Sequence, residues 1–131
     1  MRFLVTFMFC LGLLLVGCKP TGSAPSSPDG TAGKSDLKAR LDAAKAITFT
    51  SERDQALAAV ARDAAKAGDA AVTKSAIGGI VFTSAKDEAA AECALKLAAA
   101  GQGAAANEVA QMITFTSVRD ATLKKLATGG R

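Results

Sequence analysis

The chain of 131 residues contains no histidine, tryptophan or tyrosine, and its six phenylalanines are its only aromatic residues. Histidine is the usual general base near neutral pH and the commonest metal ligand. Its absence removes the central residue of most hydrolase and metalloenzyme mechanisms. Because the acidic residues are also scattered along the chain, we expect no metal site and no cofactor, and we predict that the protein is not an enzyme.

Cysteine and proline are rare, with three residues of each type. The cysteines are Cys10, Cys18 and Cys93, and the first two lie in or next to an apolar N-terminal run. Only Cys93 remains for the rest of the chain, so no disulfide can form there. A small domain without disulfides must be held by packing alone.

The N-terminus carries one positive charge, at Arg2, followed by an apolar run over residues 3–16. A transmembrane helix needs about 20 apolar residues, and this run is shorter. Its length is typical of the core of a signal peptide. The sequence therefore predicts a signal peptide over residues 1–17.

This run ends in the residues Leu-Val-Gly-Cys at positions 15–18, which resemble the lipobox of bacterial lipoproteins. The resemblance implies cleavage before Cys18 and acylation of that cysteine. The alternative is that Cys18 is one more apolar residue of the signal. The resemblance implies three acyl chains on Cys18. Two lipid signals suffice for stable anchoring, so the acylated protein should stay on its membrane. Since Lys19 rather than aspartate follows the cysteine, the resemblance favours the outer membrane of the bacterial envelope, facing the periplasm.

Residues 18–35 contain all three prolines together with many glycines and serines, and residues 36–131 contain none of the prolines and many alanines. The first segment predicts a flexible linker, because its composition buries little apolar surface. The second has the composition of helices. The formal net charge of +4 is small and dispersed, so we expect no nucleic-acid partner.

The most informative feature is an octet that occurs three times. It reads ITFTSERD from Ile47, IVFTSAKD from Ile80 and ITFTSVRD from Ile113, with successive copies 33 residues apart. A period of this length is typical of helix-turn-helix repeat units. The sequence therefore predicts an all-α domain over residues 36–131, a short α-solenoid of about three 33-residue repeats with six helices, alternately short and long.

Each octet is predicted to be a helix junction. The serines are favourable N-caps, and an acid follows each of them by three residues, as in a capping box. These pairs are Ser51 and Asp54, Ser84 and Asp87, and Ser117 and Asp120. Gly68 and Gly101 are expected to end the first two long helices.

Superposing the copies aligns apolar residues at offsets of three and four, the spacing of one helix face. We predict that these columns form the core. They include Cys93, the column Ile47, Ile80 and Ile113, and the column Phe49, Phe82 and Phe115.

Helix pairs of this length, with turns at Gly68-Asp69 and Gly101-Gln102, resemble tetratricopeptide-type repeats. The repeat unit here is one residue shorter than the usual tetratricopeptide unit, and no proline ends its second helix. A HEAT-like or other helical repeat is therefore the alternative. Either resemblance implies a protein-binding surface without inherent chemistry. We therefore expect a membrane-anchored adaptor or assembly factor with a protein partner in the envelope. The rival function is a structural or surface-coating lipoprotein without a defined ligand.

One column of the octet is basic, namely Arg53, Lys86 and Arg119. A cation near the start of a helix is mildly unfavourable because of the helix dipole. Three explanations remain: recent duplication, a ladder in which each cation meets the aspartate of the next unit, and a partner-binding surface for acidic groups. A further set, Glu88, Glu92 and Lys96, has the spacing of a solvated ion-pair face.

Overall fold

The computed structural model describes residues 33–129. The predicted signal peptide, Cys18 and all but the last residues of the predicted linker lie outside these residues. The described part is helical throughout, and no strand occurs in it. The prediction of an all-α domain is therefore confirmed. The helices are α1 (Lys34–Lys45), α2 (Thr50–Lys66), α3 (Ala70–Gly79), α4 (Thr83–Ala99), α5 (Gly103–Gln111) and α6 (Thr116–Ala127).

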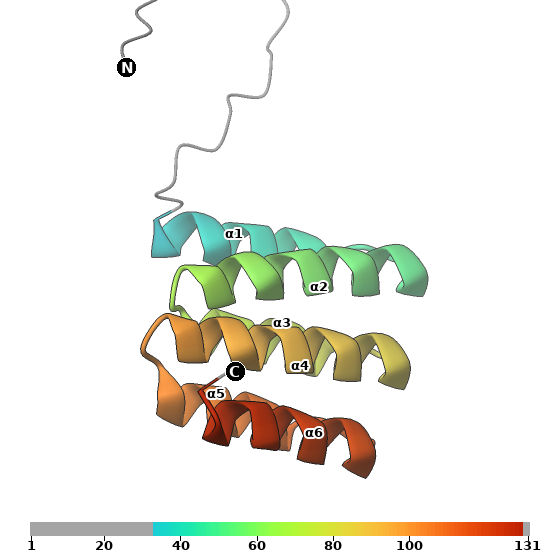
Figure 1. The fold of residues 1–131 in the computed structure, drawn as a ribbon. Coiled ribbons are helices and arrows are strands. Elements are labelled where there is room, and N and C mark those ends of the chain that lie inside the picture. Colours follow the sequence, from blue (N-terminus) through green and yellow to red (C-terminus); the bar gives the residue numbers. More distant parts are fainter. Residues whose placement is uncertain (1–32, 130–131) are drawn as a thin grey trace, which may run out of the picture.

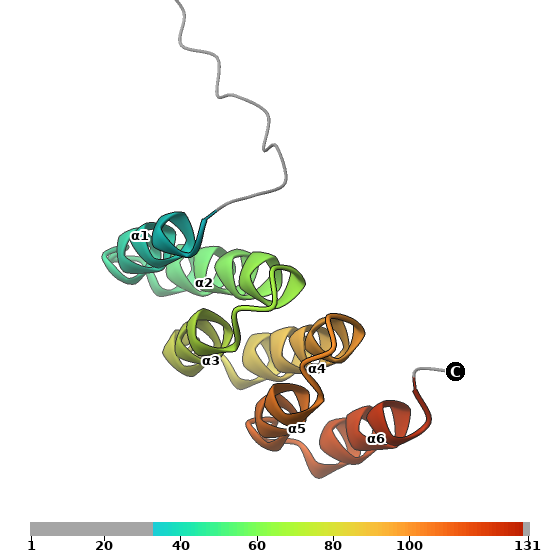
Figure 2. The ribbon, with the colours of Figure 1, turned by 90° about the vertical axis from the view of Figure 1, so that its left-hand side faces the viewer.

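The helices form two layers, with the short helices α1, α3 and α5 in one and the long helices α2, α4 and α6 in the other (Figures 1 and 2). Each helix pair packs on the next, and within the described residues the pair α1–α2 makes no contact with the pair α5–α6. The three junctions from a short to a long helix share one edge, on the right in Figure 1, and the two turns between pairs share the opposite edge.

Helix α1 begins at Lys34, two residues before the predicted domain boundary at Asp36. The backbone N–H of Asp36 donates to the carbonyl of Gly33 at 2.8 Å, which closes the first turn before that boundary. The predicted linker over residues 18–35 is therefore too long at its C-terminal end, because its last two residues are helical.

The predicted helix ends at Gly68 and Gly101 are confirmed. Both glycines have positive φ, 72° and 78°. Beyond the first of them, the N–H of Gly68 donates to Ala65 and the N–H of Asp69 to Ala64. This pair of bonds is a Schellman motif, whose left-handed residue glycine adopts without a steric penalty.

The predicted N-caps are wrong. The long helices begin one residue before each serine, their N-cap residues are the phenylalanines of the octet, and no N-cap side chain binds the helix. The hydroxyl of Ser51 instead donates to Glu52 at 2.7 Å. No capping box forms in any of the three octets, and the aspartates of the first two bind another part of the chain.

The core lies between the two layers. Leu37, Leu57, Ile77, Leu97 and Ile113 are fully or almost fully buried, and the rest is largely alanine. Small side chains let helix backbones approach closely: a Cβ at Gly79 would lie 2.9 Å from Leu57 Cδ1.

One of the predicted core columns is wrong. Phe49, Phe82 and Phe115 are 75%, 52% and 50% exposed. Ile80 and Ile113 lie in the core, as their helical offsets of three and four predict. Between the helices the backbone is extended, so helical offsets do not predict the burial of the phenylalanine two residues further on.

Candidate partner-binding surface

A buried carboxylate joins the first helix pair to the second. Asp54 in α2 is 3% exposed. Its Oδ2 accepts the backbone N–H groups of Val81 and Phe82, at 2.9 and 2.8 Å. These two residues form the junction between α3 and α4, where helix geometry leaves N–H groups without an intrahelical partner. Asp54 therefore satisfies the junction of the following pair rather than its own helix.

The same contact recurs one pair later. Asp87 in α4 is 2% exposed, and its two oxygens accept the N–H groups of Thr114 and Phe115 at 2.8 and 2.7 Å. Asp120 in α6 occupies the equivalent position of the third octet but is exposed. Within residues 33–129 its carboxylate accepts no hydrogen bond from a following junction. We call the contact at Asp54 and Asp87 the aspartate clamp.

The phenylalanines lie at the starts of the long helices. The clamps bind the backbone N–H groups of Phe82 and Phe115, but Phe49, which no clamp binds within residues 33–129, is also exposed, so the clamp is not what exposes the rings. Phe49, Phe82 and Phe115 are the N-cap residues of the three long helices, so they form a row along the edge on which Figure 1 shows the three junctions. We call this row the aromatic edge. Sequence periodicity missed it because alignment shows which residues correspond and not whether they are buried.

The basic column runs beside the aromatic edge. The backbone N–H groups of Arg53, Lys86 and Arg119 donate to the carbonyls of the three edge phenylalanines, each at 2.9 Å. Each cation therefore lies one helical turn along the chain from an N-cap phenylalanine. All three cationic residues are half-buried.

The ladder of cations and aspartates is not formed. Four ion pairs occur within residues 33–129, and none contains a member of the basic column. Asp54 and Asp87 face backbone N–H groups instead. Of the three explanations for the column, duplication and a binding surface are left.

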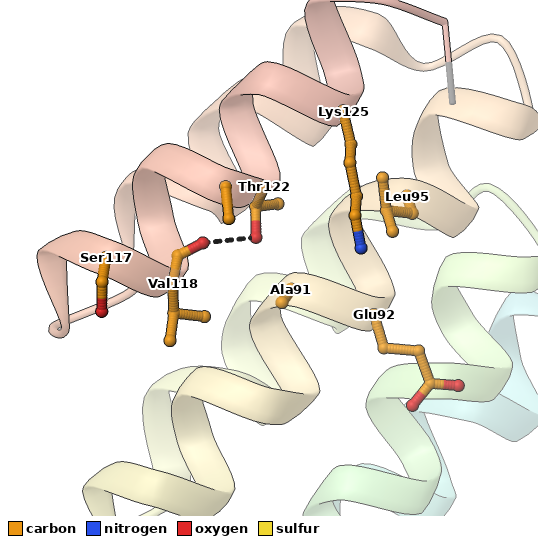
Figure 3. A pocket seen from close by; sticks show the side chains of 8 residues that line it. Ala91, Glu92, Leu95, Ser117, Val118, Thr122 and Lys125 are labelled. Atoms are coloured by element: carbon orange, nitrogen blue, oxygen red, sulfur yellow. Dashed lines mark hydrogen bonds between the residues drawn. The ribbon is translucent and has the colours of Figure 1, made fainter. Parts of the chain in front are cut away.

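Open grooves separate successive long helices. The groove between α2 and α4 has a volume of about 440 Å³ and is lined in part by Phe82, so it opens onto the aromatic edge. The groove between α4 and α6 has about 500 Å³ and a floor that includes Ala91, Leu95 and Val118, with Glu92 and Lys125 beside it (Figure 3). These grooves combine small apolar floors with charged rims.

The predicted ion-pair face is present in part, since Glu88 forms no ion pair within residues 33–129. Glu92 pairs with Lys96 at 2.8 Å and with Arg62 at 2.6 Å. Hydrogen bonds from Lys96 and then from Arg62 hold the pKa of Glu92 below its usual value, so this carboxylate stays ionised. Because these side chains are between 36% and 42% exposed, the pairs add little to stability.

Cys93 is fully buried in the core, as its column predicts. Burial raises the pKa of its thiol to about 11, so almost no thiolate, the nucleophilic form, is present near neutral pH. Residues 33–129 contain no group of acidic and cysteine side chains arranged for a metal ion. In the same range no helix is long and apolar enough to cross a bilayer.

The chain shows no significant match to a protein-family model, to a curated protein or to a solved structure. No functional residue is therefore transferred from a known relative.

Proposed function

We propose that this protein is a bacterial lipoprotein, anchored through Cys18 to the envelope side of a membrane, that acts as a protein-binding adaptor or assembly factor. Its helical domain is proposed to be a short tetratricopeptide-like α-solenoid of three repeats. The aromatic edge, with the basic column beside it, is the proposed contact surface.

The exposure of three equivalent phenylalanines is the observation that carries this proposal. Aromatic side chains and arginine are enriched in protein interfaces, and exposed apolar groups in a row mark interaction sites more often than single ones do. Here the three phenylalanines are 50–75% exposed. The adjacent cations favour a partner segment with acidic groups.

The arrangement also limits the partner's shape. Packed helices lie about 8–10 Å apart, so edge phenylalanines of successive pairs are expected at roughly that spacing. A polyproline II segment repeats a face every three residues, or about 9.3 Å. An extended acidic segment with apolar residues at every third position fits this row.

Capture of partners from solubilised membranes tests the proposed surface. Replacing Phe49, Phe82 and Phe115 together with serine should reduce capture by about tenfold or more, because buried aromatic anchors dominate interface energies. Because two of the rings are about half buried, the three changes together should cost up to about 3 kcal/mol, so capture is compared at a temperature at which circular dichroism shows the variant folded. Undiminished capture by the folded variant would remove the aromatic edge from the proposed function.

Reversing the basic column in the same assay separates its remaining explanations. If Arg53, Lys86 and Arg119 bind acidic groups, their replacement by glutamate should abolish capture, and capture by the wild type should weaken above about 0.15 M salt. The matched control reverses the exposed residues Lys34, Lys38 and Lys66, which changes net charge equally and should leave capture intact. If only duplication explains the column, both variants capture equally.

A second prediction concerns the anchor. Cys18→Ser is expected to abolish labelling by palmitate and to leave an uncleaved precursor, because the resemblance places acylation before cleavage. Mass spectrometry of the wild-type N-terminus is the complementary measurement. Equal labelling of wild type and variant would contradict lipidation at Cys18.

The rival function is a structural or surface-coating lipoprotein without a defined ligand. It predicts no specific capture by the wild type and no effect of the aromatic edge. The row of exposed phenylalanines favours the adaptor, since a protein that only coats a surface gains nothing from exposed rings.

A further inference from the structure

The two ends of the helix stack carry the two halves of the aspartate clamp. At one end Asp120 is exposed and accepts no junction N–H within residues 33–129. At the other end Thr48 and Phe49 form the junction between α1 and α2, and their N–H groups have no acceptor in the same range. An acceptor and two donors of the type that meet inside the stack are thus left open at opposite ends.

At the two ends of the stack, the packing positions beside the clamp carry opposite charges, whereas inside the stack they are uncharged. Inside the stack, Ala91 of α4 and Val118 of α6 line one groove, and two alanines occupy the equivalent positions of the preceding groove (Figure 3). In the 33-residue alignment, Lys124 on the outer face of α6 corresponds to Ala91. Glu52 at the start of α2 corresponds to Val118. Both are exposed. Small apolar pairs inside the stack therefore become a cation at one end and an anion at the other.

The exposure of the phenylalanines indicates what a preceding helix pair covers. Phe82 and Phe115, each preceded by a pair, are 52% and 50% exposed, whereas Phe49 is 75% exposed. The outward alanines of α1 also differ from their counterparts: Ala43 is exposed, and Ala76 in α3 is fully buried against the first pair. Ala43 on the outer face of α1 thus has the small side chain of a packing position that no preceding pair covers within the described residues.

We propose that copies of this chain associate head to tail, with α5 and α6 of one copy packed on α1 and α2 of the next. Asp120 then accepts the N–H groups of Thr48 and Phe49 of the next copy, and Lys124 faces its Glu52. Such a contact joins two different surfaces, so it adds copies in a row rather than closing a symmetric dimer. The charge pair is at the surface, which makes the association weak in solution. The lipid anchor proposed above would concentrate the copies on a membrane and favour their contact.

Cysteine crosslinking of the full chain tests the contact. Inside the stack, Lys74 of α3 forms an ion pair with Glu108 of α5 at 2.6 Å. The residues at the corresponding positions of the proposed contact are Asn107 of one copy and Asp42 of the next. Both positions are exposed, and α1 does not contact α5, so a chain with both replaced by cysteine should be joined only to another copy. A short bismaleimide suits them because long side chains bridge the original pair and a disulfide needs Cα atoms within about 7 Å.

The expected result is a ladder of dimers, trimers and larger products on a denaturing gel. Chains with only Asp42→Cys or only Asn107→Cys are the matched controls, and beyond the wild-type background their one added cysteine can form nothing larger than dimers. The wild type reports the background from native cysteines. A double variant that yields no products beyond those of the single variants would overturn the proposal.

Two further changes in the double-cysteine chain test the chemistry of the contact. Asp120→Ala should reduce the ladder about tenfold, the effect of losing a charge-assisted hydrogen bond. Lys124→Glu should reduce it about threefold by placing like charges together, and adding Glu52→Lys should restore it. A ladder that ignores all three changes would show a different contact and would overturn this one. Partner capture is measured separately, so failure here leaves the proposed function standing.

Discussion

Asp87→Ala is expected to lower the free energy of unfolding of the helical domain by about 3 kcal/mol. The substitution removes two hydrogen bonds from a buried carboxylate, at 2.8 and 2.7 Å, and leaves the N–H groups of Thr114 and Phe115 without acceptors. Hydrogen bonds to charged groups contribute about 1.5–3 kcal/mol each, and contributions from one group do not add fully. For a domain of this size the melting temperature should fall by about 12–24 °C, readily seen by circular dichroism.

Asp120→Ala is the matched control, because it changes the same residue type at the same position of the octet. Asp120 is exposed and holds no junction within residues 33–129. Its replacement should change the free energy of unfolding by no more than about 0.5 kcal/mol in dilute solution. Equal losses from Asp87→Ala and Asp120→Ala would show that the octet aspartates act within their own helices, contrary to the clamp.

Asparagine distinguishes the two clamps further. Asp87 uses both carboxylate oxygens, whereas Asp54 accepts both of its N–H groups at Oδ2. Asparagine offers only one acceptor oxygen and places an NH₂ group at the other position. We therefore expect Asp87→Asn to destabilise the domain more than Asp54→Asn.

Leu97→Ala is expected to have an effect of similar size through a different cause. Leu97 in α4 has no exposed surface. Removing a buried leucine side chain loses its transfer free energy and leaves a cavity, at a cost of about 3 kcal/mol or more. Many of the other buried residues of the core are alanines, whose short side chains cannot move in to fill the space. Urea denaturation followed by circular dichroism measures the loss.

Phe82→Ala provides the contrast. From sequence alone it resembles the removal of a buried aromatic ring, which costs about 3–5 kcal/mol. With Phe82 52% exposed, we expect a loss of only about 1 kcal/mol. A loss as large as that of Leu97→Ala would place the ring in the core and remove the aromatic edge as a binding surface.

The sequence by itself determined the helices and much of the core. Alanine-rich composition, helical spacing of apolar residues and the positions of Gly68 and Gly101 are local properties, and they act through backbone conformation within a few residues. The burial of Cys93 was also predictable from the sequence, since Cys93 belongs to the apolar stripe of its helix and this stripe is the side that faces the core. The 33-residue spacing of the octets also predicted that corresponding helices would start at corresponding residues, as Thr50, Thr83 and Thr116 do.

Only the tertiary structure decided what the octet does. The partners of Asp54 and Asp87 lie 27 and 28 residues away along the chain, so no local rule could assign them. The exposure of the phenylalanines follows from their place at the junctions and not from the clamp, since Phe49, whose junction is not clamped within residues 33–129, is exposed like Phe82 and Phe115. Asp87 and Asp120 have the same octet position and different surroundings, since burial of the carboxylate requires a following helix pair. Sequence equivalence therefore fixed which residues correspond, whereas packing between neighbouring pairs decided which of them are buried, bonded or open to a partner.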